Sequence, residues 1–300
     1  MYRFQSLAIL AGIVGLFALV GYSLFGWTGV VLIIAGSLIF NLFSLSGSAR
    51  MILSFHRARP ISEWEMPELY RISEALAARA NISTPSLAIY PSDMPNAFAL
   101  GVGNGVVALS SGLLRLLDRR EIAGVLAHEF AHLKNRDSLL NLSAGLFVRA
   151  ISFLSTLFGI LVFLLFLSGA WLSIGTNLIP LILLTSIAPY GAIFLHATLM
   201  RTREFLADRD AAMLTGDPGG LGNALIKLEQ ANRYLSRLQR RFRFIYTSDA
   251  RTGPRWLRTH PPTEERVRAL CEISDRTRPF PSAPVLPASR PIGPRRIIIT

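Results

Sequence analysis

Two long stretches without a charged side chain constrain the fold of this chain more than any other feature. The first runs from Phe4 to Ala49 and the second from Ala150 to Met200. A helix needs about 20 apolar residues to cross a bilayer, so each stretch is long enough for two crossings joined by a turn. We therefore predict two transmembrane helical hairpins, with spans at 5–24, 28–47, 149–170 and 178–200.

Residues typical of turns and interfaces lie between the paired spans. Gly26 and Trp27 mark the first turn, and the segment 171–177 separates the second pair. Pro180 and Pro189 fall within the fourth span, where neighbouring helices or water can satisfy the carbonyls that proline leaves free. The alternative interpretation of the second pair is a buried apolar hairpin that does not fully cross the membrane.

The distribution of charge predicts an orientation. Lysine and arginine flank the ends of the spans that lead into polar segments, and both turns lack charge. By the positive-inside rule, both termini and the polar segments face the cytoplasm, in a multi-pass protein of the inner (plasma) membrane. Attraction to anionic headgroups of the lipid bilayer explains the net charge of +12 without a nucleic-acid partner. The single cysteine, Cys271, agrees with a reducing compartment.

The polar segments predict a mainly α protein with a small β-sheet. Helices are expected at 62–80, from Asp118 onwards, at 201–215, at 218–241 and after Thr263, with short strands at 86–90 and 105–109. The predicted organisation is an N-terminal transmembrane hairpin (1–49), a first polar part (50–137), a second hairpin (138–200), a second polar part (201–275) and a Pro/Arg-rich disordered tail (276–300).

The segment AHEFAHLKNRD at 127–137 carries the strongest chemical signal. His128 and His132 stand four residues apart, so on a helix their rings lie on one face and can converge on a single ion. Glu129 is rotated about 100° around the axis, beside the ion, where it can take a proton from a metal-activated water. This pattern predicts one catalytic zinc ion with Glu129 as general base.

A catalytic zinc site needs a third protein ligand, which must come from elsewhere in the chain. Glu204 is the best candidate, because its helix follows the return of the second hairpin to the cytoplasmic face. Asp208 shares the face of Glu204 and is expected to accept a hydrogen bond from a ligand histidine. The alternative is that these carboxylates pair with Arg201 or Arg203.

The remaining histidines give weaker signals. His260 is placed rigidly before two prolines and is a candidate donor to the oxyanion of a tetrahedral intermediate; a structural histidine in a helix-entry turn is the equal alternative. We expect His56 to be interfacial and His196 to pack within a span.

In combination, five motifs closely resemble the HtpX-type membrane zinc metalloproteases, which are relatives of the CAAX prenyl proteases. They occur in the family's order and cover most of residues 1–270. The motifs are Pro91–Phe98, Ser111–Asp118, His128–His132 with Lys134–Asp137, Arg203–Asp208 and His260–Arg266.

The resemblance implies a gluzincin-type zinc metalloendopeptidase with zinc on His128, His132 and Glu204 and with Glu129 as the base. It also implies a stress-response role in the quality control of membrane proteins, whose polypeptides would be the substrates. An extended substrate would pair with an edge strand that begins at Asn96, Ala97 and Phe98.

Two competing interpretations remain open. A CAAX-type processing enzyme would share the chemistry but act on prenylated tails in a large intramembrane chamber, which four spans are too few to enclose. A non-catalytic membrane scaffold with a structural zinc would normally need four protein ligands, and Cys271 is far from the motif. The sequence leaves open the physiological substrate, the oligomeric state and another divalent ion in place of zinc.

Overall fold

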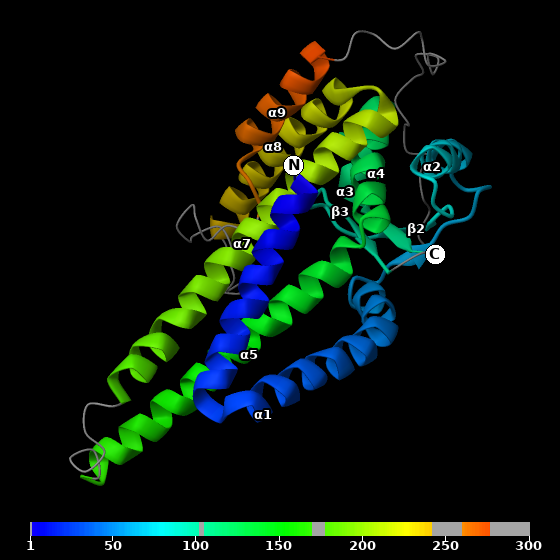
Figure 1. Cartoon of the computed structure of the whole chain (residues 1–300). Coiled ribbons are helices and arrows are strands. Elements are labelled where there is room, and N and C mark those ends of the chain that lie inside the picture. The colour runs from blue at the N-terminus through cyan, green and yellow to red at the C-terminus, as the bar shows by residue number, and fades with distance from the viewer. Residues whose placement is uncertain (1, 102–104, 170–177, 242–259, 277–300) are drawn as a thin grey trace. The chain divides into compact units, whose positions relative to one another are not determined.

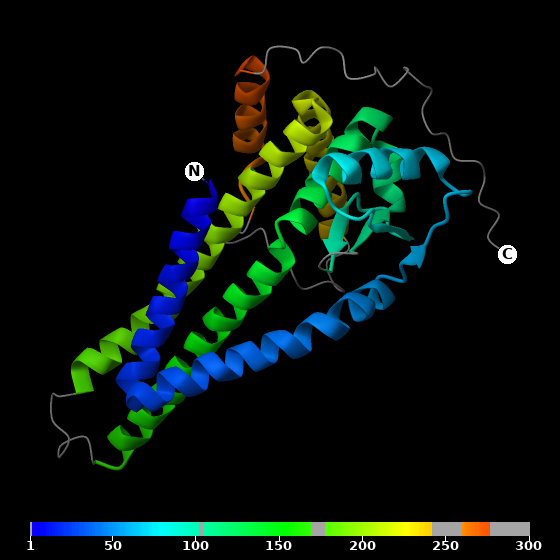
Figure 2. The same cartoon turned by 45° about the vertical axis from the view of Figure 1, so that its right-hand side comes forward.

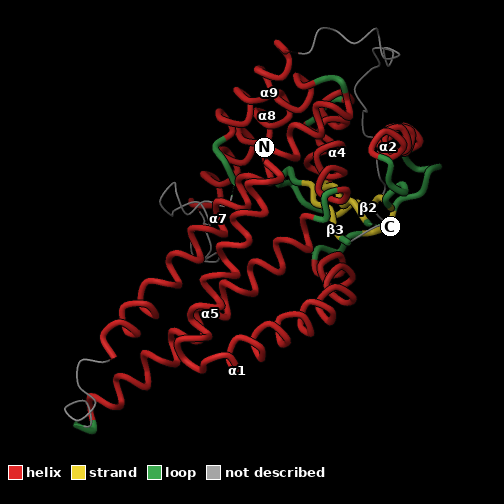
Figure 3. Tube along the Cα trace, in the orientation of Figure 1, coloured by secondary structure: helices red, strands yellow, loops and turns green. Residues whose placement is uncertain are grey.

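The computed structural model describes residues 2–101, 105–169, 178–241 and 260–276 and is mainly helical, with one small sheet (Figure 3). Figure 1 labels most of the helices and strands along the chain. The helices are α1 (Tyr2–Phe55), α2 (Pro67–Ala80), α3 (Ser111–Leu116), α4 (Arg119–Lys134), α5 (Asp137–Leu167), α7 (Ile179–Thr215), α8 (Pro218–Arg241) and α9 (Thr263–Arg276). The strands are β1 (Arg59–Pro60), β2 (Ser86–Tyr90), β3 (Ala97–Leu100) and β4 (Val106–Ser110).

The chain forms two compact units, each described here by itself. The first contains the described residues 2–46, 139–169, 178–203 and 260, and the second contains 47–101, 105–138, 204–241 and 261–276.

The first unit is built from apolar helices. Phe17 of α1, Ile151 of α5 and Ala192 of α7 belong to one buried cluster, in which the small alanine lets the helices approach closely. Many large apolar side chains on these helices point outward, as expected for helices that contact lipid. Within the described residues, three stretches are long and apolar enough to cross a membrane: Tyr2–Val31, Asp137–Leu167 and Ile179–Thr215.

The predicted turn at Gly26 is confirmed. Gly26 adopts φ 62° and ψ −155° inside α1, a backbone conformation that breaks the helix and that glycine adopts without steric cost. Helix α1 changes direction there, at the lower end of the blue ribbon (Figure 2). The segment 28–47 is helical as the second arm of α1, and its crossing of the membrane stays a prediction. The connection at 171–177 lies outside the described residues.

The later spans differ from the prediction in their boundaries. Helix α5 begins at Asp137, twelve residues before the expected start at 149. The fourth span and the predicted helix at 201–215 are one continuous helix, α7. The change from apolar to charged residues near Arg201 indicates where the membrane is expected to end. The helix does not end there, because arginine, glutamate and leucine are good helix formers.

The sheet of the second unit has the strand order β1-β2-β4-β3. Strands β2 and β4 are parallel, and β3 pairs antiparallel with β4 in a register that places Phe98 opposite Ala108. Leu87, Val107 and Leu109 belong to the main core with residues of α2 and α4, whereas Ala88, Tyr90 and Ala108 form a smaller cluster with Leu53 near the end of α1. The short strands thereby give α4 a rigid support.

The strand predictions agree with the structure to within a few residues. The strand at 86–90 is confirmed, and that at 105–109 is found at 106–110. Strand β1 and helix α3 were not predicted, because two residues and six residues are too short to show a periodic pattern. Helix α2 begins at Pro67 instead of Ser62, because proline favours the first helical turn and lacks the N–H that a longer helix would need.

Replacing Gly124 with alanine is expected to destabilise the second unit. A Cβ atom at this position of α4 would lie 2.7 Å from the Leu221 nitrogen and 2.9 Å from its Cα on α8. Such overpacking costs about 1–3 kcal/mol, which would lower the melting temperature measured by circular dichroism in detergent. Gly222→Ala is the matched control, since nothing lies within 4 Å of a Cβ there. Equal melting temperatures for wild type and Gly124→Ala would contradict the close approach of the two helices.

Candidate metal centre

Helix α4 begins with a reciprocal cap that fixes its first turn. The Glu121 N–H donates to Asp118 Oδ1 at 3.0 Å, and the Asp118 N–H donates to Glu121 Oε2 at 2.9 Å. Glu121 is buried, and the Lys227 ammonium of α8 lies 2.7 Å from its carboxylate. A capping box and a partly buried ion pair therefore hold the helix that carries the two histidines of the motif.

His128 and His132 present their Nε2 atoms to each other from successive turns of α4. These two atoms are 3.0 Å apart. The outward-facing ring nitrogens both meet a carboxylate: His132 Nδ1 is 2.6 Å from Asp137 Oδ2, and His128 Nδ1 is 3.0 Å from Asp208 Oδ1. The second contact is too oblique for a well-aligned hydrogen bond and acts as an electrostatic contact. Carboxylates on Nδ1 favour a proton there and leave Nε2 able to bind a metal.

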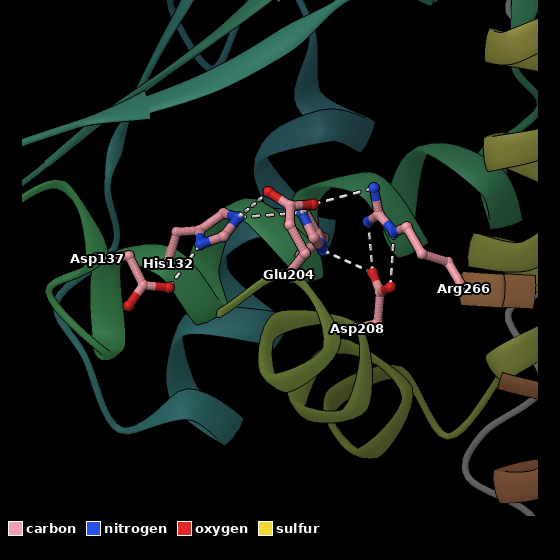
Figure 4. Close-up of polar contacts among 6 residues, drawn as sticks. His132, Asp137, Glu204, Asp208 and Arg266 are labelled. Carbon is pink, nitrogen blue, oxygen red and sulfur yellow. Dashed lines mark hydrogen bonds and ion pairs between the residues drawn. The ribbon is translucent and has the colours of Figure 1, made fainter. Parts of the chain in front are cut away.

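Glu204 reaches the same point from α7 (Figure 4). Its Oε2 lies 3.7 Å from His128 Nε2, and its Oε1 lies 3.9 Å from His132 Nε2. The two ring nitrogens and the carboxylate can offer ligand atoms that all lie within 4.8 Å of one another. Ligands of a tetrahedral zinc ion at about 2.0–2.1 Å are about 3.3 Å apart, so this donor set fits zinc.

Two side chains at this site had no assigned role in the sequence analysis. Arg266 of α9 contacts both Glu204 and Asp208 (Figure 4), and Asp137 is the partner of His132. The available signal was weak in both cases. Asp137 stands five residues after His132, and Arg266 stands six after His260 in a motif already noted, but neither spacing predicts a contact.

The charged side chains of the site shift one another's pKa values. Burial alone would lower the pKa of His132, but the nearby carboxylates, first among them Asp137, raise it from 6.5 to about 9 in the metal-free protein. Burial would raise the pKa of Asp208, but the guanidinium of Arg266 and the ring of His128 lower it. The same carboxylate raises the pKa of Arg266, although burial opposes this shift.

Zinc binding is expected to strengthen as the pH rises towards 9. Coordination needs a neutral imidazole, whereas His132 holds a proton below its pKa of about 9, so affinity should fall about tenfold for each pH unit below that value. The stability of the metal-free protein depends on pH in the opposite direction. The charged ring of His132 stabilises the metal-free fold fully below a pH of about 6.5, and this contribution is lost as the pH rises through about 9.

Competition with a chelating dye over this pH range measures the zinc affinity, after correction for the dye's own titration. Asp137→Asn is the control, because removing the carboxylate should make the pH dependence shallower. An affinity that stays constant between pH of about 6.5 and 9 would contradict the expected proton release.

The structure brings His128, His132, Glu204 and Asp208 together. Glu129 is buried next to His128 on α4, and its role as base stays a prediction. His260 is exposed, and its role stays a prediction.

The other predicted positions have clear structural settings. Asn96 precedes β3, where its carbonyl accepts from the Ser110 N–H at 2.9 Å, and β3 packs against α4. His56 stacks near Tyr90 and Phe98, with ring centroids 5.3 and 5.2 Å away. His196 was expected to pack within a span; its Nε2 lies 2.9 Å from Asn141 Oδ1, so its packing includes a polar contact between α5 and α7.

The chain is similar in sequence to known proteins. Residues 63–274 match the profile of peptidase family M48. The chain belongs to peptidase family M48. Its M48 relatives include proteins described as "Protease HtpX homolog" from Pelotomaculum thermopropionicum, 38% identical over 87% of this chain and 95% of that protein, and from Pyrococcus furiosus, 37% identical over 89% and 94%. Another from Salinibacter ruber is 36% identical over 92% of this chain and 99% of that protein.

A solved structure also resembles this M48 chain. The crystal structure of Ste24p from S. mikatae matches with a TM-score of 0.49 and 21% sequence identity, covering 89% of this chain and 64% of that one. The family and the three convergent donors identify the chain as a zinc metallopeptidase of the M48 family, with multiple membrane-spanning helices. The resemblance to HtpX-type proteases drawn from the motifs is confirmed.

Proposed function

We propose that the chain is an endopeptidase that hydrolyses peptide bonds of misfolded membrane proteins at the cytoplasmic face of the inner membrane. The observation that carries this proposal is the convergence of His128, His132 and Glu204 in a buried site with a carboxylate, Glu129, beside it. An open catalytic site with three protein ligands differs from a structural zinc site, which four protein ligands normally close. Among the residues that the structure describes, the donor set consists of these three side chains, which argues against the non-catalytic scaffold.

Each side chain of the site has a separate task in this proposal. A zinc ion held by His128, His132 and Glu204 would polarise the scissile carbonyl and make a water molecule more acidic. Glu129 takes the proton from that water and delivers it to the leaving amine. Asp137 keeps the ring of His132 in one orientation, and Asp208 does the same for His128.

His260 is proposed to donate a hydrogen bond to the oxyanion of the tetrahedral intermediate. It precedes two prolines, which restrict the backbone of the segment that leads into α9. A donor placed in advance at the developing negative charge typically contributes a factor of about 10²–10³ to kcat.

The substrate is proposed to bind as an added strand on β3, beginning at Asn96, Ala97 and Phe98. Two features support this: β3 is the terminal strand in the order of the described sheet, and it packs against α4, the helix of the histidines. Backbone pairing at a sheet edge selects an extended chain with little regard to its side chains. Such recognition suits unfolded segments better than a single short tail motif.

Cleavage of three substrates by the full-length chain tests this proposal. The purified protein, reconstituted in vesicles, is given a destabilised membrane protein, a soluble unfolded protein such as casein, and a farnesylated peptide. We expect the membrane protein to be cleaved fastest at internal sites, with activity lost in a chelator and restored by zinc. Faster cleavage of the farnesylated peptide would instead favour a prenyl-protein processing enzyme, and no zinc-dependent cleavage of any substrate would refute the proposal.

A further inference from the structure

Arg266 reaches the metal centre from α9 and contacts two carboxylates of α7 at once. Its Nη1 lies 3.0 Å from Glu204 Oε2, while its Nε and Nη2 donate to Asp208 Oδ2 and Oδ1 at 2.7 and 2.6 Å. All three side chains are buried, with residue exposures of 8% for Arg266, 5% for Glu204 and 2% for Asp208. The planar guanidinium therefore uses one edge for a bidentate pair and another nitrogen for a second acid.

The two carboxylates need such a cation because of their spacing. Glu204 and Asp208 are four residues apart on α7, so their side chains lie on the same face one turn apart. Two ionised acids in a buried setting repel each other strongly, and each would otherwise move away or bind a proton. A lysine would offer a point charge, whereas the fixed fork of arginine sets the direction of both acids.

The contacts of Arg266 extend to two of the three proposed metal ligands. It touches Glu204 directly through Oε2, while Glu204 Oε1 lies 3.9 Å from His132 Nε2. It reaches His128 through Asp208, since Asp208 Oδ1 is shared by Arg266 Nη2 and His128 Nδ1. Figure 4 shows Arg266 on the opposite side of Glu204 from His132.

We propose that Arg266 is a positioning residue that sets the orientation of Glu204 and Asp208 before the metal binds. Helix α9 thereby becomes part of the metal centre although it supplies no ligand. The helix is itself fixed, since Leu270 is fully buried in the main core and α9 packs along α8. This role goes beyond the proposed function and does not depend on which substrate is cleaved.

Zinc affinity of the metal-free, full-length protein in detergent is the direct test, measured by competition with a chelating dye. Arg266→Met, which keeps length but removes charge and fork, should weaken zinc binding about 10–100-fold, as loss of a group that orients a ligand does. Arg266→Lys should lie between Met and wild type. Arg268→Met is the matched control on the exposed face of α9 and should bind zinc as the wild type does.

Two further readouts separate positioning from mere stability. In an Asp208→Asn background, Arg266→Met should weaken zinc binding further, because the direct contact with Glu204 is also lost. Arg266→Lys, loaded with zinc, should lower kcat while KM changes by less than about twofold, since the reacting centre and not substrate binding is disturbed. If Arg266→Met does not fold, Arg266→Lys decides the question alone.

The proposal is overturned if the folded Arg266 variants bind zinc with wild-type affinity. Equal zinc affinity for Asp208→Asn and for the double variant Asp208→Asn/Arg266→Met would contradict a contribution of the direct contact between Arg266 and Glu204. A drop in melting temperature without either change would assign Arg266 a purely structural role and also overturn the proposal.

Discussion

Replacing Glu129 with glutamine is expected to abolish proteolysis while the protein still binds zinc. The amide has nearly the same shape as the carboxylate, so α4 and its two histidines keep their positions, but it cannot accept a proton from water. General base catalysis contributes about 10²–10⁴-fold to rate, and we expect kcat/KM to fall by at least that factor. Cleavage of an unfolded protein and metal analysis of the same sample measure both properties.

The zinc content of this variant is its own control. A variant that is inactive but fully loaded separates the loss of the base from the loss of the metal. Proteolysis at the wild-type rate by zinc-loaded Glu129→Gln would refute the assignment of the base. Inactivity accompanied by loss of zinc would instead place Glu129 among the groups that hold the metal.

Replacing Glu204 with alanine is expected to remove zinc from the site. The carboxylate is the one proposed ligand that does not come from α4, and two histidines alone leave the ion with an incomplete donor set. We expect zinc affinity to fall by more than about 100-fold, beyond the range seen when only an orienting group is lost. Metal analysis after gel filtration and titration with zinc measure this change.

Glu121→Gln is the matched control for Glu204→Ala. Glu121 is also a buried carboxylate of the second unit, but it caps α4 and pairs with Lys227 instead of facing the metal centre. Its loss should lower the melting temperature and leave zinc bound. Full zinc occupancy in Glu204→Ala would remove this residue from the ligand set and require another third ligand.

The local part of the site could be predicted from the sequence because helix geometry alone determines it. Spacing of four residues places His128 above His132, and the same rule places Asp208 on the face of Glu204. Asp118 and Glu121 likewise predict the start of α4, because their cap involves only neighbouring residues. In each case the interacting groups are less than two helical turns apart.

The contacts that join distant segments could not be predicted in this way. Arg266 lies 58 residues from Asp208 in sequence, and no periodicity relates the two positions. Strand β1 exists only because Arg59 and Pro60 lie beside β2, since two residues have no pattern of their own. The sequence did not predict that α7 is one continuous helix, for a different reason. Hydropathy indicates whether a helix is surrounded by lipid or by water, but it does not indicate where the helix begins or ends.

The connection between α4 and α5 is expected to tolerate little change in its length. Only Asn135 and Arg136 separate the two helices, and Arg136 has φ 54°. Asn135 donates to Asp210 of α7 at 2.8 Å, and Asp137, the next residue after the turn, accepts from the ring of His132. Surface connections usually tolerate insertions. Here we expect a single added residue to carry Asp137 away from the imidazole, so that the contact between Asp137 and His132 restricts the length of this short loop.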